Sequence, residues 1–243
     1  MNTWNEQAKA LAQPLESLLV SRYPVTLPSE YRYAHLSLAL IDAVFSLGAR
    51  YESTRATVLR FAKVEPLRPF RESLDVWPSL DAQQPLADLL TRYRQRGMDS
   101  MLSEVYQNRQ RTSSHESAIT KAEAVLRAAT LLVSYHVNYF QDIPKVMANR
   151  SFADDFRAIP GQTSGTGLAY LWMLTGSDMH IKPDRMVIRF IEQATSLRGL
   201  SPQQTQRLVE AALELLRPQF PGLTVRQIDY VIWSYERFRT RHA

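Results

Sequence analysis

Apolar residues recur along this chain at the spacing of one face of an α-helix, and the pattern persists over most of its length. Leu36, Leu40, Ala43, Val44 and Leu47 form one such stripe. No segment shows the alternation of apolar and polar residues that is typical of a strand. The sequence therefore predicts an all-α protein. Helices are expected near 4–22, 30–47, 53–64, 83–96, 98–107, 117–137, 142–149, 151–158, 164–176, 183–197, 202–217 and 224–240.

Turn-forming and capping residues divide these helices. Residues 64–84 contain three prolines and several charges, which predicts a long connection with little regular structure. Residues 109–116 form a second polar connection. Ser201 with Pro202, and Thr224, have the side chains expected at helix starts.

Composition excludes several classes of function. The chain has no cysteine, which excludes disulfides, a cysteine nucleophile and a cysteine-bound zinc or iron–sulfur site. The histidines have no metal-ligand spacing, so neither a metal nor a cofactor is expected. No apolar stretch reaches the roughly 18 residues of a membrane span, and we expect no membrane association and a cytoplasmic location. The net charge of +5 is compatible with a polyanionic partner.

The segment 156–190 combines a Pro-Gly turn, small hydroxyl residues and the start of a new helix. Glycines allow the backbone to approach another group closely. Free N–H groups at a helix start carry the positive end of the helix dipole. Together they can bind a phosphate without reading a base. The alternative interpretation is an ordinary turn between two packed helices.

The residues of this segment that match a known motif are Ile159, Pro160, Gly161, Thr166, Asp184, Val187 and Arg189. The segment resembles the helix-hairpin-helix motif of the DNA glycosylase superfamily that includes endonuclease III, adenine glycosylase and alkyladenine glycosylase. In that motif a Pro-Gly hairpin precedes an apolar helix and then Asp-x-x-Val-x-Arg. Two positions differ here, because Thr163 replaces the usual second hairpin glycine and Gly167 replaces the usual alanine.

The resemblance extends upstream of the hairpin. Residues 120–123, Thr-Lys-Ala-Glu, are similar to a Lys-Ala helix start of the superfamily, and 40–50 with 52–54 are similar to its first scaffold helix and following loop. The resemblance implies one two-lobed helical domain over 1–243. One lobe would contain the hairpin, near 48–177, and the other would combine 1–47 with 178–243.

The resemblance also implies a catalytic role for Asp184. Base excision passes through a positively charged, oxocarbenium-like sugar, which a fixed carboxylate stabilises more than it stabilises the substrate. The carboxylate can also orient or deprotonate a water. Pro183 disfavours helix at Lys182 and places Asp184 near the first turn of a new helix. The alternative is that Asp184 is an acidic residue that only complements the helix dipole.

Bifunctional members of the superfamily carry a nucleophilic lysine in the hairpin, and the corresponding position here is Gly165. The resemblance therefore implies a monofunctional enzyme that leaves an abasic site. Lys182 lies on the other side of Pro183, where it would contact phosphate or solvent. The resemblance also implies a catalytic role for Asp42, as the second acid that the adenine-excising branch uses to protonate the leaving base or to hold a water. The alternative for Asp42 is a buried or capping residue with a structural hydrogen bond.

The remaining predicted contacts are with double-stranded DNA. Arg50 and Tyr51 follow the first scaffold helix and would fill the gap left by an extruded base, although Tyr51 also fits a core position. The full set of predicted DNA-binding residues is Gly161, Thr163, Gly165, Thr166, Lys121, Lys182, Arg50 and Tyr51. No obligatory protein partner is expected.

The sequence thus predicts a DNA glycosylase for repair or for defence against modified phage DNA. Uracil, alkylated or oxidised bases and bulky modified cytosines are all candidate substrates. Two alternatives stay open: a DNA-binding protein of the same fold without catalysis, and an all-α protein–protein interaction module. No phosphate-binding loop, nucleophile elbow or zinc signature supports another enzyme class.

Overall fold

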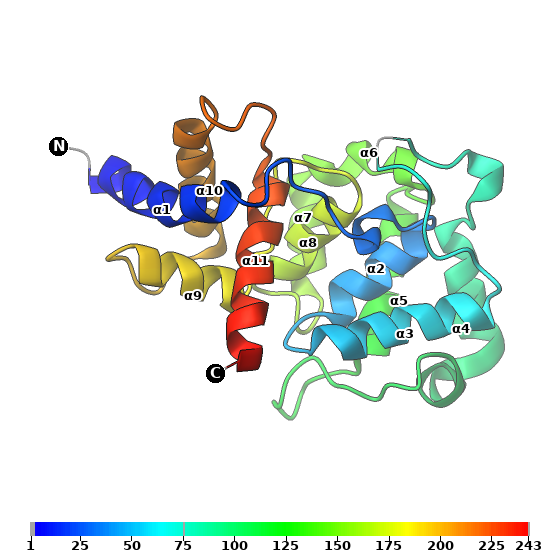
Figure 1. The fold of residues 1–243 in the computed structure, drawn as a ribbon. Helices are drawn as coiled ribbons and strands as arrows, with labels where there is room; N and C mark the ends of the chain where they lie inside the picture. The colour runs from blue at the N-terminus through cyan, green and yellow to red at the C-terminus, as the bar shows by residue number, and fades with distance from the viewer. Residues whose placement is uncertain (1–2, 75, 243) are drawn as a thin grey trace. The chain divides into compact units, whose positions relative to one another are not determined.

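The computed structural model describes residues 3–74 and 76–242, with side chains for 4–74 and 76–239 (Figure 1). Within these ranges the chain is all-α, as predicted, with two isolated β-bridges and no strand. The α-helices are α1 (Thr3–Leu19), α2 (Leu36–Phe45), α3 (Tyr51–Val64), α4 (Leu86–Ser100), α5 (Lys121–Ser134), α6 (Pro144–Met147), α7 (Arg150–Ala158), α8 (Thr166–Leu174), α9 (Arg185–Ala194), α10 (Pro202–Leu216) and α11 (Val225–His242). The shorter helices are three 3-10 segments and one π segment: Ser29–Arg32, Leu80–Ala82, Phe140–Asp142 and, as the π segment, Met101–Val105.

Capping side chains set several helix boundaries. The predicted start at Ser201 is confirmed, because its Oγ accepts the Gln204 N–H at 3.2 Å and the Gln204 side chain accepts the Ser201 N–H at 2.9 Å. The predicted start at Thr224 is confirmed by the same reciprocal arrangement with Gln227, at 3.2 Å and 3.0 Å. These boundaries follow from local chemistry that the sequence displays.

The helix expected over 30–47 is shorter than predicted and begins at Leu36. The backbone before it pairs with the connection after α3 instead. The Ala34 N–H donates to the Pro69 carbonyl at 3.0 Å, and the Arg71 N–H donates to the Arg32 carbonyl at 2.7 Å. Because these hydrogen bonds use backbone groups that a helix would need, residues 32–35 stay outside α2.

The chain divides into two compact units. Unit 1 comprises Met1–Pro28 and Ser177–Ala243, and unit 2 comprises Ser29–Gly176. The resemblance had placed α2 with the lobe that corresponds to unit 1, and this placement is wrong. All ten residues of α2 are buried, and the helix packs against α3, α5 and α8. A helix that is buried on every side needs neighbours all round it, and unit 2 supplies them.

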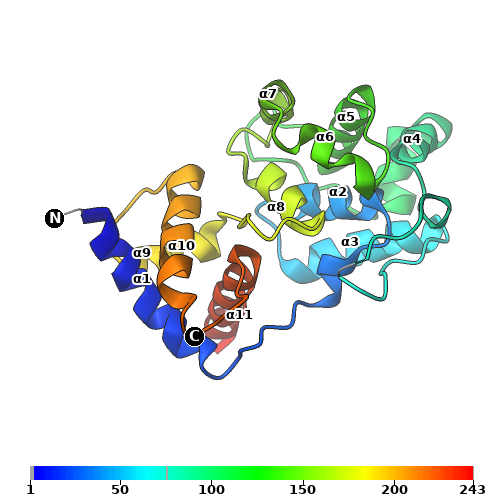
Figure 2. The same cartoon turned by 90° about the horizontal axis from the view of Figure 1, so that it is seen from above.

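Unit 1 is a small helical cluster with its own apolar core. Helix α1 packs against α10, and α9 packs against α11, which it crosses at a steep angle in Figure 1; Figure 2 shows the same helices from above. The core residues include Leu11, Leu15, Leu208, Ala212 and Ile228, each almost fully buried. None of the helices in the described ranges combines the length and the hydrophobicity that a bilayer span requires.

Unit 2 is organised around α2, and Lys121 at the start of α5 joins the two helices. Its Nζ donates to the carbonyls of Phe45 at 2.8 Å and Leu47 at 2.7 Å, and to the Gln110 side chain at 3.2 Å. The side chain is only 3% exposed. A cation at the negative end of a helix satisfies carbonyls that have no partner within the helix. The predicted DNA contact of Lys121 is therefore wrong, because its ammonium group caps α2 from inside the unit.

Replacing Lys121 by Met should lower the free energy of unfolding by about 2–4 kcal/mol, because buried carbonyls lose a charged donor. Urea denaturation measures this change. The control is Lys145→Met, which removes an exposed lysine paired with Asp142 and should change stability by less than about 0.5 kcal/mol. A Lys121→Met protein as stable as the wild type would contradict the capping role.

Candidate functional site

Residues 159–165, here called the hairpin, join α7 to α8 in unit 2. Gly161 and Gly165 have φ angles of +86° and +76°, in the left-handed region that glycine adopts at little cost. The Gln162 N–H donates to the Ile159 carbonyl at 2.9 Å, and the Gly165 N–H donates to the Gln162 carbonyl at 2.9 Å. Two tight turns thus follow one another, which leaves a short polar tip at the surface.

The tip exposes only some of the predicted DNA-binding groups. Gly161, Thr163 and Ser164 are exposed, and their N–H groups make no backbone hydrogen bond in the described ranges. Gly165 and Thr166 are buried. The Thr166 N–H lies 3.3 Å from the Ser164 Oγ, which accepts a hydrogen bond from it. The prediction that the Gly165 N–H faces a ligand is therefore wrong, because the hairpin's own turn uses that donor.

Packing explains why position 167 is a glycine where the motif usually has an alanine. A Cβ atom there would lie 2.1 Å from Oε1 of Gln162 and 3.3 Å from a methyl group of Leu47. The Gln162 side chain is 1% exposed, and its amide has no hydrogen-bond partner among the described residues. The Gln162 side chain therefore fills the space that a side chain at position 167 would need. A residue larger than glycine at 167 would require Gln162 to move.

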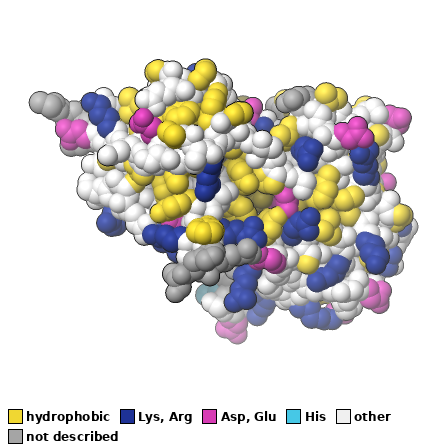
Figure 3. All heavy atoms as spheres, in the orientation of Figure 1, with side chains coloured by type: hydrophobic (Ala, Val, Ile, Leu, Met, Phe, Trp, Pro, Cys, Tyr) yellow, Lys and Arg dark blue, Asp and Glu magenta, His cyan; other side chains and the backbone are white. Residues whose placement is uncertain are grey.

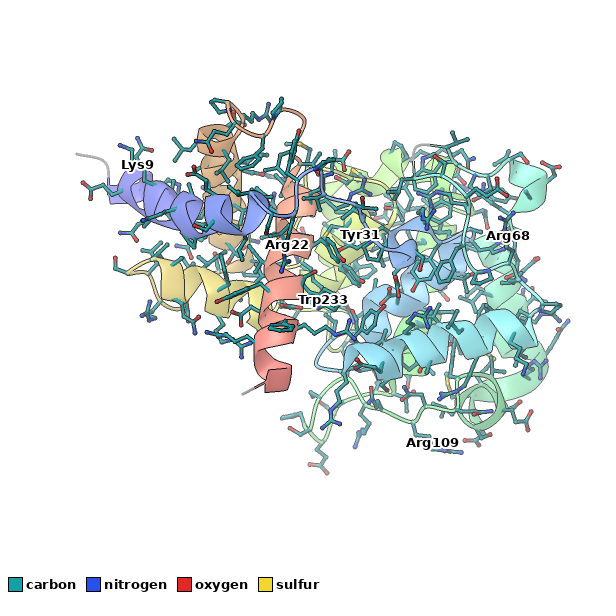
Figure 4. All side chains as sticks on the ribbon, in the orientation of Figure 1. Lys9, Arg22, Tyr31, Arg68, Arg109 and Trp233 are labelled. Carbon is teal, nitrogen blue, oxygen red and sulfur yellow. The ribbon has the colours of Figure 1, made fainter. Side chains whose placement is uncertain are left out.

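Neighbouring segments complete the surface of the hairpin. A Cβ atom on Gly161 would lie 2.4 Å from the Cβ of Thr112, so the connection between the π segment and α5 packs directly on the hairpin. Arg109, labelled in Figure 4, is an exposed residue of that connection. The Nε of Arg157, on α7, lies 3.1 Å from the Cβ position of Gly165. Arg157 places a half-exposed guanidinium beside the hairpin, and no motif in the sequence marks this residue.

In unit 1, a turn at Lys182, Pro183 and Asp184 leads into α9. The Asp184 N–H donates to the Lys182 carbonyl at 2.7 Å. Asp184 is the N-cap of α9, and its Oδ1 accepts the N–H groups of Met186 at 2.8 Å and Val187 at 3.2 Å. The predicted position of Asp184 at a helix start is confirmed. Oδ2 makes no hydrogen bond with any residue that the structure describes.

The other residues of the Asp-x-x-Val-x-Arg spacing fix α9 in unit 1. Val187 is 1% exposed and belongs to the core. Arg189 forms an ion pair with Glu236 on α11, with an Nη2–Oε2 distance of 2.5 Å, and Glu236 is fully buried. The three positions therefore act locally as a cap, a core contact and a link to α11.

Asp229 on α11 is a second acid beside Asp184. It is 3% exposed, and its Oδ1 accepts the Lys182 N–H at 2.8 Å. Burial and the negative charge of Asp184 raise the pKa of Asp229 to about 8, from an ordinary value of 3.8. No motif in the sequence marks Asp229, although it lies on the same helical face as Val225, Ile228 and Ile232. An acid at a core-facing position was the available signal.

Asp42 is a buried acid of unit 2, 5% exposed, on α2. Its Oδ2 accepts the hydroxyl groups of Tyr33 at 3.0 Å and Tyr170 at 3.2 Å. Burial and the charge of Asp42 raise the pKa of Tyr33 well above its ordinary value. These hydrogen bonds correspond to the structural alternative for Asp42, and they link α2 to α8.

The two residues predicted to fill a gap in DNA differ in their surroundings. Tyr51 is half-buried, and its hydroxyl donates to Glu30, which also accepts from Arg55 at 2.9 Å. Arg50 is the exposed N-cap residue of α3. Of the two, Arg50 has the more accessible side chain.

Helix α11 carries the half-buried ring of Trp233 (Figure 4), and the guanidinium of Arg237 lies 4.9 Å from the centre of that ring.

Comparison with known proteins gives a family but no activity. The family model described as a domain of unknown function, DUF8548, matches residues 9–237. The chain belongs to the DUF8548 family. The match spans both units, so this family includes the hairpin and the Asp184 turn in one domain. No curated protein and no solved structure shows a significant match.

A metal site in this DUF8548 protein would need several acidic or histidine side chains close together. Among the described residues, no group of three or more His, Asp or Glu side chains has that arrangement.

The raised pKa of Asp229 predicts how the stability of this DUF8548 protein depends on pH. Between about pH 4 and about pH 8 the folded state holds a proton that the unfolded state has released. The free energy of unfolding contributed by Asp229 should therefore fall as pH rises through this window, by at most about 6 kcal/mol. Urea denaturation at several pH values measures the slope.

Asp229→Asn should remove this part of the pH dependence, because an amide does not titrate in this range. Glu214→Gln is the matched control, since it removes an exposed acid of unit 1 that pairs with Arg217, and it should leave the slope unchanged. Equal slopes for Asp229→Asn and the wild type would contradict a protonated, buried Asp229.

Proposed function

We propose that this chain is a monofunctional DNA glycosylase that hydrolyses the N-glycosidic bond of a damaged or modified base. The observation that carries the proposal is the arrangement of Asp184. One of its carboxylate oxygens is fixed by two backbone N–H groups, and the other makes no hydrogen bond within the described ranges. A helix cap of this kind fixes a carboxylate in place and leaves one oxygen for chemistry.

The proposed reaction uses that oxygen to stabilise positive charge. As the bond from C1′ to the base nitrogen breaks, its electron pair leaves with the base and the sugar becomes oxocarbenium-like. A carboxylate already held by backbone donors needs no reorganisation to stabilise this charge. The departing base takes up a proton from solvent, a water bonds to C1′, and the proton that this water gives up passes to Asp184 and then to solvent. The products are a free base and an abasic site.

The hairpin supports a contact with the DNA backbone. Its exposed N–H groups at Gly161, Thr163 and Ser164, with Arg157 beside them, suit a phosphate oxygen. Lys and Arg side chains are spread over the visible face of both units, with acidic side chains among them (Figure 3). This distribution and the net charge of +5 favour a sequence-independent attraction to DNA.

The chain offers no amine for a covalent mechanism at the hairpin. Residues 159–176 contain no lysine, and position 165 is a glycine. Without such an amine no Schiff base forms with the sugar, and the abasic strand is left uncut. The substrate is either a damaged base, excised in DNA repair, or a modified base of phage DNA, excised in defence.

A DNA-binding protein without catalysis is the second candidate. The observation that favours it is the cap itself, because an aspartate at an N-cap stabilises a helix whether or not it takes part in chemistry. The two candidates differ in what the charge of Asp184 does, and one substitution separates them.

Asp184→Asn should preserve the cap and remove the charge, since Asn and Asp cap helices about equally well. The free energy of unfolding should change by less than about 1 kcal/mol. The single-turnover rate of base excision should fall by at least about 100-fold, because a preorganised electrostatic group is lost. DNA affinity, measured in parallel, should stay the same or rise, since a negative group is removed.

The control is Glu192→Gln on the same helix, which keeps an acceptor for the Gly199 N–H and should retain the wild-type rate. An Asp184→Asn protein that is folded and excises at the wild-type rate would remove Asp184 from the mechanism. A wild-type protein that binds DNA but releases no base would favour the second candidate.

Ser164→Glu should weaken binding to any DNA duplex by about 10-fold, because a carboxylate then faces the phosphate. Fluorescence anisotropy at two salt concentrations measures the affinity. Thr130→Glu places the same charge on the exposed face of α5 in the same unit and should change the affinity by less than about 2-fold. Equal losses in the two variants would show a general charge effect and would exclude the hairpin as a specific contact.

A further inference from the structure

We propose that Asp229, on α11, is a positioning residue for Asp184, because it holds the turn that precedes α9. The inference rests on the proposed glycosylase function and assigns a role to a residue outside the motif.

Side chains of two helices hold the turn that presents Asp184. The Lys182 N–H donates to Oδ1 of Asp229 at 2.8 Å, and the Ile181 N–H donates to Oε1 of Gln206, on α10, at 3.0 Å. The next residue, Pro183, has its φ angle restricted by its ring. The Asp184 N–H then closes the turn on the Lys182 carbonyl at 2.7 Å. Because the turn is this short, the position of the Lys182 N–H determines the position of the Asp184 backbone.

Asp184 is therefore fixed from both sides. Its carboxylate is bonded to the first turn of α9, and the backbone just before it is bonded to Asp229 on α11. The pair Arg189 and Glu236 holds α9 and α11 together further along. A reacting carboxylate must keep its place to within a fraction of an ångström, and these bonds supply that constraint.

The environment of Asp229 favours its neutral form. Burial and the negative charge of Asp184 disfavour ionisation of Asp229, and they outweigh the Lys182 N–H hydrogen bond and the Lys182 charge, which favour it. Arg226, earlier on α11, pairs with Asp178 at 2.7 Å, and Arg189 and Arg239 pair with Glu236. His180 experiences the charge of Glu210. Helices α1 and α10 contribute apolar side chains to the surrounding core.

A proton on Asp229 has a clear consequence for Asp184. While Asp229 is neutral, its Oδ1 still accepts the Lys182 N–H, and Asp184 is the single charged carboxylate of the pair. When Asp229 ionises, its buried negative charge lies beside the negative charge of Asp184. The repulsion and the cost of burying a charge then favour displacement of the turn. Excision should therefore decline as pH rises above about 8.

The test measures single-turnover excision between pH 6 and pH 10 in the full-length chain. The substrates are duplexes carrying uracil, an alkylated adenine, 8-oxoguanine or 5-hydroxymethylcytosine, and the rates are taken on the duplex that the wild type processes fastest. The wild-type rate should fall by about 10-fold or more between pH 7.5 and pH 9.5. Asp229→Asn keeps an oxygen acceptor but cannot ionise, so it should stay within about 3-fold of the wild type at pH 7 and lack the alkaline loss.

Asp229→Ala removes the acceptor and should lose about 10-fold or more in rate at pH 7, with DNA affinity within about 2-fold of wild type. Glu214→Gln should follow the wild-type profile throughout. If Asp229→Asn shows the same alkaline loss as the wild type, the inference fails and the glycosylase function stands. If the wild type excises none of these bases, the proposed function fails, and the inference fails with it.

Discussion

The bonds from Asp184 to the first N–H groups of α9 are the interaction on which the functional account depends. A proline at 183 stops the preceding segment from joining the helix, so Asp184 becomes the N-cap. The cap uses one carboxylate oxygen and fixes the orientation of the other. The same local chemistry that starts a helix therefore also creates a preorganised charge. The proposed catalysis therefore needs no feature of α9 beyond this N-cap.

Buried polar groups hold the functional segments of both units. Lys121 caps α2 in unit 2, the Tyr33 and Tyr170 hydroxyls hold Asp42, and Asp229 holds the turn before Asp184 in unit 1. Each group is removed from water, so each depends on its partner, and its loss would cost more than a surface contact. The hairpin tip is exposed, and Oδ2 of Asp184 makes no hydrogen bond with any residue that the structure describes.

Local signals in the sequence predicted much of the fold. Apolar periodicity located the helices, and the side chains of Ser201 and Thr224 marked two starts, because these signals act over three or four residues. The late start of α2 and the burial of Lys121 were not predictable in this way, since both depend on residues far away in the chain. Gln162 and Gly167 carried no local signal for their shared space, and Asp229 was detectable only as an acid on an apolar face.

The most direct test of the central claim is the product that the wild-type protein makes from DNA. Duplexes carrying candidate modified bases would be incubated with the protein, and free base would be measured by mass spectrometry together with strand cleavage before and after alkali. The account predicts that a free base is released in equal amount to alkali-labile sites, with no cleavage before alkali and no trapping by borohydride. A folded protein that binds these duplexes and releases no base from any of them would contradict it.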